Sequence, residues 1–258
     1  MANIARFCGA SLSSFTQRSV FFSRHFAATS STNATLNRFN KPLSGAEIPR
    51  SGGITTAFRL PFVQDDKLEG LDACFVGIPM DQGATNRSGQ RLAPRAIRNE
   101  SVMVRPVNMT GAVPFDSLQV ADIGDVPTTP YNLSRTLDMI TAFYRKILAA
   151  GPVPLTLGGD HTLSLPVLRA FREHYGRPVG LIQIDAHPDL LDELNGEKIG
   201  SLTPFRRALE EDLIDPKFMV QIGLRGTLQS EDEISEQLDW AQKQVMCAVD
   251  ACARGEIN

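Results

Sequence analysis

The chain contains few of the residues that mark several common classes of protein. Its 258 residues include one tryptophan, three tyrosines, four histidines and four cysteines. The cysteines Cys8, Cys74, Cys247 and Cys252 do not have the paired spacing of a zinc site or a redox motif. Cys74 lies inside an apolar segment, where a thiol acts as a small buried hydrophobe. Nothing in this pattern indicates an oxidising compartment.

Long apolar runs and basic clusters are also missing. No run is long enough to cross a bilayer, which argues against a membrane protein. The 26 basic and 29 acidic residues give a formal net charge of −3, and no group of lysines and arginines forms a basic face that would favour a nucleic-acid partner. With 42% apolar residues, the chain can bury the core of one globular domain.

Acidic residues are absent from the N-terminal segment, where the first is Glu47. The same segment holds four arginines among serines, alanines and phenylalanines: Arg6, Arg18, Arg24 and Arg38. This composition is typical of a mitochondrial transit peptide. We therefore expect residues 1–38 to be a transit peptide and the protein to be mitochondrial. A merely disordered tail is the alternative.

Apolar periodicity predicts strands that alternate with helices, the pattern of an α/β fold with a parallel sheet. The predicted strands cover residues 73–78, 118–126, 153–157, 179–184 and 218–224. A short helix is expected to open at Pro94, because proline is tolerated in the first turn. Longer helices are predicted over 134–150, 160–174 and 204–213, and residues 229–239 are helix-compatible.

Residues 153–184 have the order strand, helix, strand, which is the spacing of a βαβ unit. We expect the two strands to be parallel neighbours joined by a right-handed crossover. Their carboxyl ends then lie at the same edge of the sheet, where open α/β sheets place their binding sites.

Histidines and aspartates gather at these two strand ends. Gly158 and Gly159 make a tight exit from the first strand. Asp160 can then cap the following helix by accepting its free N–H groups. Asp185, His187 and Asp189 follow the second strand at positions i, i+2 and i+4. In extended backbone, side chains two residues apart point the same way.

Two imidazoles mixed with carboxylates suit a divalent ion such as Mn²⁺. Crowded carboxylates repel one another unless cations neutralise them, and a pair of ions about 3.5–4 Å apart would do so. We predict the metal ligands His161, Asp185, His187 and Asp189. Taken singly, the Gly-Gly-Asp turn also fits a plain helix cap, and a strand-end aspartate or histidine fits a solvated loop. The cluster as a whole favours a metal site.

The stretches LGGDH (157–161) and DAHPD (185–189) resemble the first two metal motifs of the ureohydrolases, the arginase and agmatinase family. Further stretches resemble the branch of agmatinases and guanidino acid hydrolases: 77–83, 86–89, 94–98, 196–198, 203–207 and 221–226. The resemblance covers about residues 39–244.

This resemblance implies a three-layer α/β/α fold around a mainly parallel sheet, with two Mn²⁺ ions. It implies hydrolysis of a small guanidino substrate, such as agmatine or a guanidino acid, to urea and an amine. By the same resemblance, His161 and Asp189 bind one ion, His187 binds the other and Asp185 bridges both. The family also suggests a homo-oligomer.

Two parts of the family pattern are different here. We find neither the Asp-x-Asp metal motif of a later strand nor a downstream substrate-binding glutamate in residues 245–258. We therefore expect a partial ureohydrolase domain over 39–244, without its last strands, and a divergent tail over 245–258. Ser201 stands where relatives usually carry a histidine, and serine does not titrate near neutral pH. We expect this chain to be a poor catalyst and assign no residue a catalytic role.

Two other functions remain open. The chain could be a catalytically inactive ureohydrolase-like protein that regulates or joins an oligomer of complete subunits. Metal-dependent deacetylases share a related fold, but the loops 86–94 and 196–207 resemble agmatinases and argue against that class.

Overall fold

The computed structural model describes residues 41–64 and 67–226. The predicted transit peptide (1–38), the helix-compatible stretch 229–239 and the divergent tail (245–258) lie outside the described residues, and the expectations about them stay predictions. None of the described helices is long and apolar enough to span a membrane.

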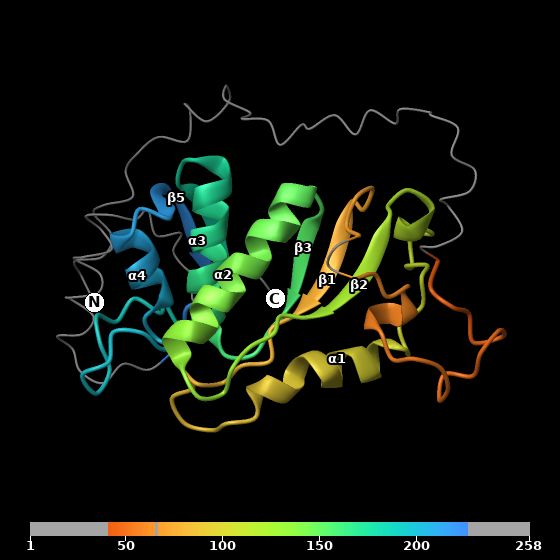
Figure 1. Ribbon diagram of the computed structural model, residues 1–258, viewed down its shortest axis with the longest axis horizontal. Helices are drawn as coiled ribbons and strands as arrows, with labels where there is room; N and C mark the ends of the chain where they lie inside the picture. The colour runs from red at the N-terminus through yellow and green to blue at the C-terminus, as the bar shows by residue number, and fades with distance from the viewer. Residues whose placement is uncertain (1–40, 65–66, 227–258) are drawn as a thin grey trace, which may run out of the picture. The chain divides into compact units, whose positions relative to one another are not determined.

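Five strands form two parallel sheets in the described part of the chain (Figure 1). In the first sheet β1 (Ala73–Gly77) lies between β2 (Val120–Asp125) and β3 (Val153–Leu157), and both pairings are parallel. In the second sheet β4 (Val179–Ile184) pairs in parallel with β5 (Ile214–Ile222). The prediction of an α/β fold with parallel strands is confirmed.

The described residues also form four α-helices and several short 3₁₀ turns. The α-helices are α1 (Ala93–Ser101), α2 (Leu133–Ala150), α3 (Ser164–Tyr175) and α4 (Pro204–Glu210). The 3₁₀ turns are η3 (Ala57–Arg59), η4 (Gln90–Leu92), η5 (Pro114–Asp116) and η6 (His161–Leu163). Helix α3 packs between α2 and α4, and these three helices lie together on one side of the strands (Figure 1).

The first sheet packs its apolar side chains against α2. Cys74, Val76 and Ile78 are fully buried with Leu137 and Ile140 in one cluster. Burial, followed by the charge of nearby Asp122, raises the pKa of the Cys74 thiol to about 12. The thiol therefore stays protonated, as expected for a small buried hydrophobe.

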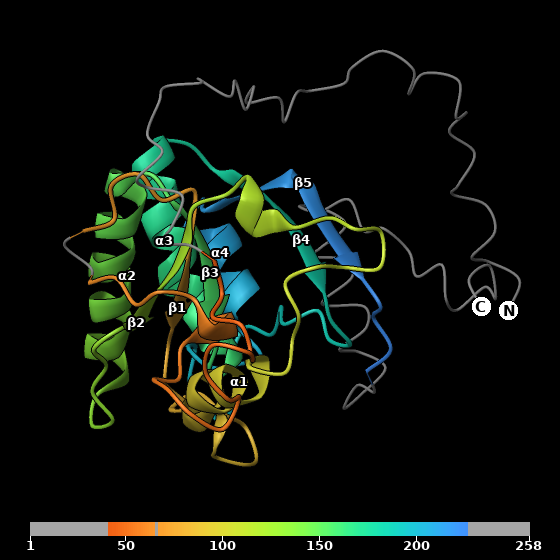
Figure 2. The ribbon, with the colours of Figure 1, turned by 90° about the vertical axis from the view of Figure 1, so that its right-hand side faces the viewer.

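The second sheet has a covered face and an exposed face. Its covered face contributes Ile214 and Met219 to a cluster with α3 and α4. The opposite face carries apolar side chains that are largely exposed in the described structure: Ile182 (72%), Ile184 (80%), Phe218 (65%) and Ile222 (46%). Figure 2 shows this sheet set apart from the strands of the first.

A buried arginine fixes α1 to the end of β2. Arg98 donates to both carboxylate oxygens of Asp122 (2.7 and 3.0 Å) and to Asp125 (2.6 Å). Burial alone would lower the pKa of Arg98, but the hydrogen bonds and charges of the two aspartates outweigh burial and raise it. The ion pairs hold α1, and with it the loop that leads into α1 from β1.

The predicted pairing of residues 153–157 with 179–184 is wrong. Within the described residues β3 pairs with β1, and β4 pairs with β5. A helix with its side chains is about 10–12 Å wide, whereas paired strands are about 4.8 Å apart. The crossover through α3 can therefore pass over more than one strand position, and sequence spacing does not fix which strand is adjacent.

The start of β5 also differs from the prediction. The strand begins at Ile214, not at residue 218, and its pairing with β4 jumps from Ile214 to Met219. The residues in between bulge out of register, and they include Pro216, which has no N–H to donate. In the sequence, residues 215–217 have the composition of a turn, and for this reason the strand was predicted to begin only at residue 218.

Candidate metal centre

A tight turn after β3 positions His161. Gly159 allows this turn because a Cβ at this position would collide with the carbonyl oxygen of Met80. Asp160 then caps η6, accepting the backbone N–H of Thr162 at 2.8 Å and of Gly83 at 2.8 Å. The predicted helix cap is confirmed, and the same carboxylate ties the His161 turn to the loop after β1.

A pair of buried glutamines holds the loop that follows β4. Gln221 donates to the side-chain oxygen of Gln183 at 2.6 Å and to the carbonyl of Pro188 at 2.8 Å. Gln183 donates in turn to the carbonyl of His187 at 3.0 Å. The sequence analysis did not identify these two residues. Their signal was present, because each is the one amide within a run of otherwise apolar residues, 179–184 for Gln183 and 218–224 for Gln221.

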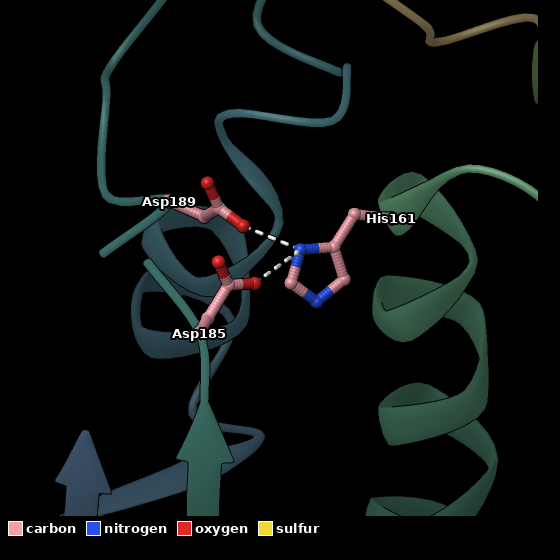
Figure 3. A group of neighbouring side chains, drawn as sticks. All are labelled: His161, Asp185 and Asp189. Atoms are coloured by element: carbon pink, nitrogen blue, oxygen red, sulfur yellow. Dashed lines mark ion pairs between the residues drawn. The ribbon is translucent and has the colours of Figure 1, made fainter. Parts of the chain in front are cut away.

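Three of the predicted ligands converge (Figure 3). One ligand atom from each of His161, Asp185 and Asp189 lies within 4.8 Å of the others. Nδ1 of His161 faces both carboxylates, forming an ion pair with Asp189 and lying 3.6 Å from Asp185. Asp189 is buried and has a left-handed backbone (φ 54°), a conformation that costs energy and is often found at functional sites.

The carboxylates change the protonation of the imidazole. Burial of the ring disfavours the charged form, but the hydrogen bond to Asp189 and the charges of neighbouring aspartates outweigh this effect and raise the pKa of His161. A proton on His161 therefore partly neutralises the two carboxylates. A divalent cation between the same atoms would neutralise them more completely and would displace that proton.

His187 stays outside the group of three. Its Nδ1 lies 3.7 Å from Asp185, and its side chain is 54% exposed. Its backbone N–H donates to Asp185 at 3.0 Å. Gly226 lies so close that a Cβ on it would collide with the His187 ring. The structure thus brings Asp185 and Asp189 together, as the predicted i, i+2, i+4 spacing requires. It leaves His187 beside them, and of the other three predicted ligands His187 has a recorded contact with Asp185.

A cavity of about 450 Å³ opens beside this cluster. His161, Asp160 and Ser201 line it on one side, and the loop after β1 lines the other with residues that include Arg87 and Gln90. The side-chain oxygens of Gln90 and Ser201 are buried without a hydrogen-bond partner in the described structure. Such atoms are costly unless a ligand or water donates to them. The sequence analysis identified Ser201 but gave Arg87 and Gln90 no role.

The donor set fits a divalent cation that prefers oxygen and imidazole ligands. Two carboxylates and one imidazole nitrogen stand within reach of one ion, a combination that suits Mn²⁺ better than a metal that prefers thiolates. Repulsion between Asp185 and Asp189 is a further reason for a cation to bind there.

Comparisons with known proteins identify the family of this chain. The family model described as the arginase family matches residues 71–250, which is more than half of the chain. A guanidinobutyrase from Pseudomonas aeruginosa is 52% identical over 214 residues, covering 82% of this chain and 66% of its own length. A mitochondrial agmatinase from Gallus gallus is 50% identical over 203 residues, covering 78% of this chain and 59% of its own.

The fold is also found in a solved structure. Proclavaminate amidino hydrolase from Streptomyces clavuligerus matches with a TM-score of 0.71 at 35% sequence identity, over 81% of this chain and 67% of that one. The chain spans about two thirds or less of the length of these curated relatives. On its sequence and its fold, the chain belongs to the arginase family, the ureohydrolases.

Proposed function

We propose that this chain is a manganese-binding ureohydrolase that cleaves a small guanidino compound into urea and an amine. The convergence of His161, Asp185 and Asp189 beside a cavity of suitable size carries the proposal. These three residues would hold one Mn²⁺, and His187 with Asp185 would contribute to a second. Family membership and the names of two relatives, a guanidinobutyrase and an agmatinase, support this chemistry.

The metal would supply a Lewis acid that lowers the pKa of water, which hydrolysis of an unreactive guanidinium needs near neutral pH. The chain's own residues would orient the substrate. The buried oxygens of Gln90 and Ser201 lack partners in the described structure, and they would accept N–H bonds from the guanidinium. Asp160 would keep the His161 turn and the opposite cavity wall in fixed positions through its two backbone hydrogen bonds.

Metal binding tests the first half of this proposal. We expect the purified chain to bind Mn²⁺ in a calorimetric titration. The Asp189→Asn variant should bind Mn²⁺ at least about tenfold more weakly, because mutating even a residue that only supports a metal ligand lowers metal affinity by about that factor. Glu193→Gln is the matched control, since Glu193 is an exposed acid near Asp189 outside the cluster. Equal affinity of the wild type and Asp189→Asn would remove Asp189 from the metal site.

Urea release tests the second half. We expect slow release from agmatine and 4-guanidinobutanoate, because Ser201 provides no group that titrates near pH 7. Ser201 lines the cavity, so a Ser201→His variant places an imidazole there. We expect it to release urea at least about tenfold faster, since a positioned general acid–base contributes about 10²–10⁴-fold.

The alternative function is a non-catalytic subunit that joins or regulates an oligomer. Ser201 lines the cavity and His187 is not part of the three-residue ligand group, and both observations favour this alternative. It predicts that the chain co-purifies with a complete ureohydrolase subunit and that Ser201→His still releases no urea. Urea release by either form of the isolated chain would contradict it.

We also propose mitochondrial import directed by residues 1–38, with 39–244 as the ureohydrolase domain and 245–258 as a separate tail. The arginine-rich, acid-free leader supports this location, as does the mitochondrial relative from Gallus gallus. The bacterial guanidinobutyrase is equally similar, so a fusion of residues 1–38 to a fluorescent protein is the direct test. A cytosolic signal would contradict the proposal.

A further inference from the structure

The start of helix α4 is joined to the loop that carries two of the predicted ligands. The backbone N–H of Phe205, in the first turn of α4, donates to the carbonyl of Asp189 at 3.3 Å. Just before the helix, the carbonyl of Leu202 accepts the N–H of Leu191 at 3.2 Å. Asp189 has a left-handed backbone (φ 54°), and a conformation of this kind persists only where the surrounding structure holds it. The first turn of α4 supplies part of that hold.

The side chain of Phe205 contacts another predicted ligand. Its ring meets the imidazole of His161 edge-on, with 5.2 Å between the ring centroids and 82° between the ring planes. Phe205 is 3% exposed and belongs to a buried apolar cluster that includes Leu165 and Leu190, so its ring has a fixed position. Aromatic rings prefer this T-shaped arrangement. The contact therefore favours one orientation of the His161 ring over others.

In the described part of the chain, the His161 imidazole has no hydrogen bond at its second nitrogen, Nε2. Its Nδ1 faces Asp185 and Asp189, and Nε2 points away from both (Figure 3). A metal-binding imidazole is usually oriented by a hydrogen bond from this second nitrogen to a carboxylate or a carbonyl. Here the edge-on contact with Phe205 stands in the place of such a hydrogen bond.

Burial of Phe205 alone would mark an ordinary core residue. The two contacts go further, because this one residue meets a ligand that follows β3 and a ligand that follows β4. We propose that Phe205 is a positioning residue of the candidate metal centre, with its ring orienting His161 and its N–H holding Asp189. This inference rests on the proposed function, since it assumes that Mn²⁺ binds between these ligands. Ligands that are held in place beforehand lose less freedom on binding, which raises affinity.

Mn²⁺ binding to the full 258-residue chain tests the role of the ring without depending on turnover. Phe205→Leu keeps an apolar side chain and the backbone N–H but removes the aromatic edge. We expect the affinity for Mn²⁺, measured from the electron paramagnetic resonance signal of the free ion, to fall by about two- to tenfold, the range that loss of an aromatic pair implies. The nitrogen coupling in the spin-echo spectrum of the bound ion should change as well, because it reports how the imidazole is placed. Phe205→Met is a second variant without the ring and should give the same result.

The matched control is Leu213→Val, which removes apolar volume from the same buried cluster beyond the far end of α4. It should lower the melting temperature of the metal-free chain, as Phe205→Leu should, because both loosen the packing of the core. It should leave the Mn²⁺ affinity and the nitrogen coupling unchanged. A purely structural role for Phe205 predicts instead that the two variants have the same effect on Mn²⁺.

A double-mutant cycle with His161→Ala tests whether the ring acts through the imidazole. Phe205→Leu should weaken Mn²⁺ binding in the wild-type background and cause no further loss in the His161→Ala background, because the contact that it removes is already gone there. An equal loss in both backgrounds would mean that the ring acts on some other group, which would overturn the assignment.

The outcomes separate this inference from the proposed function. If the wild type binds Mn²⁺ and Phe205→Leu binds it equally well, the role of Phe205 is wrong and the metal site stands. The same conclusion follows if Leu213→Val weakens Mn²⁺ binding as much as Phe205→Leu does. If the wild type binds no Mn²⁺, the proposed function fails and the inference fails with it.

Discussion

The two sheets have strands of similar composition in very different surroundings. In β1, Val76 is fully buried against α2. In β4, Ile182 occupies an equally apolar strand but is 72% exposed in the described structure. Both sheets contribute to the candidate metal centre, since His161 follows β3 and the two clustered aspartates follow β4. The comparison shows that an apolar strand sequence predicts a strand but does not fix how many of its faces are covered.

The largest expected effect belongs to the first region. Arg98→Ala leaves Asp122, which is 1% exposed, without its buried partner. Breaking a buried ion pair from one side costs about 3–5 kcal/mol, so we expect the free energy of unfolding in urea to fall by that amount. Arg95 in the same helix is exposed, so Arg95→Ala should change the free energy of unfolding by less than about 0.5 kcal/mol. Equal losses would mean that the buried ion pair contributes no more to stability than the exposed arginine does.

A matched pair of threonine substitutions tests the comparison directly. Val76→Thr keeps the side-chain shape but buries a hydroxyl, which costs about 1–3 kcal/mol. Ile182→Thr keeps a β-branched residue on an exposed face and should cost less than about 0.5 kcal/mol. Thermal unfolding of both variants gives the contrast. If Ile182→Thr destabilises as much as Val76→Thr, that face of the second sheet is covered in solution.

The second region should be most sensitive at its buried glutamines. Gln221→Leu removes the amide that donates to Gln183 and to the carbonyl of Pro188. Buried acceptors are then left without a hydrogen bond, which should lower the free energy of unfolding by about 1–3 kcal/mol. Because these bonds hold the loop from Asp185 to Asp189, Mn²⁺ affinity should also fall by about 10–100-fold. The exposed Gln64→Leu is the control. A stability loss with unchanged metal affinity would show that the loop keeps its shape without Gln221.

The smallest effect, and one that depends on pH, is expected at Asp81. The hydrogen bond from Arg91 lowers the pKa of Asp81 most. Burial opposes this effect and two backbone N–H bonds add to it, so the pKa is about 2, below its ordinary value of 3.8. A lowered pKa stabilises the fold above the ordinary value, and this stabilisation disappears as the pH falls through about 2. Because the Arg91 side chain is 47% exposed, we expect about 1 kcal/mol after screening.

The measurement is urea unfolding of the wild type and Asp81→Asn. The difference in stability should be constant from pH 7 to about 4 and should narrow below that. Asp138→Asn, an exposed residue of α2, should show no such difference. A gap between the wild type and Asp81→Asn that persists unchanged to pH 2 would contradict the assigned pKa.

Much of the local structure could be predicted from the sequence. The bounds of β3 and β4 match the predicted residues, and Gly151 and Gly176 end α2 and α3 in left-handed conformations. The Asp160 cap was predicted as well. These features depend on nearest neighbours along the chain, such as a glycine that tolerates positive φ or a carboxylate one turn from free N–H groups. Such interactions are contained in a short stretch of sequence.

Two of the features that the sequence did not predict depend on residues far apart in the chain, and a third depends on an irregular backbone. The pairing of β3 with β1 depends on packing between helices, which the spacing of residues 153–184 does not encode. The link between Gln183 and Gln221 joins two different strands. The position of His187 depends on local backbone after β4, which is not fully extended, so the alternation of side chains assumed for 185–189 does not hold through the whole loop.

Asp160 has a consequence for the kinetics of the site. One carboxylate accepts the amide of Thr162 in the turn that carries His161 and the amide of Gly83 in the loop after β1. When this side chain rotates away, both amides lose their acceptor in a single event. Their hydrogens should therefore exchange with solvent at coupled rates. Opening of the turn that carries His161 and opening of the loop after β1 become one fluctuation, whose frequency is set by a residue that we do not assign as a metal ligand.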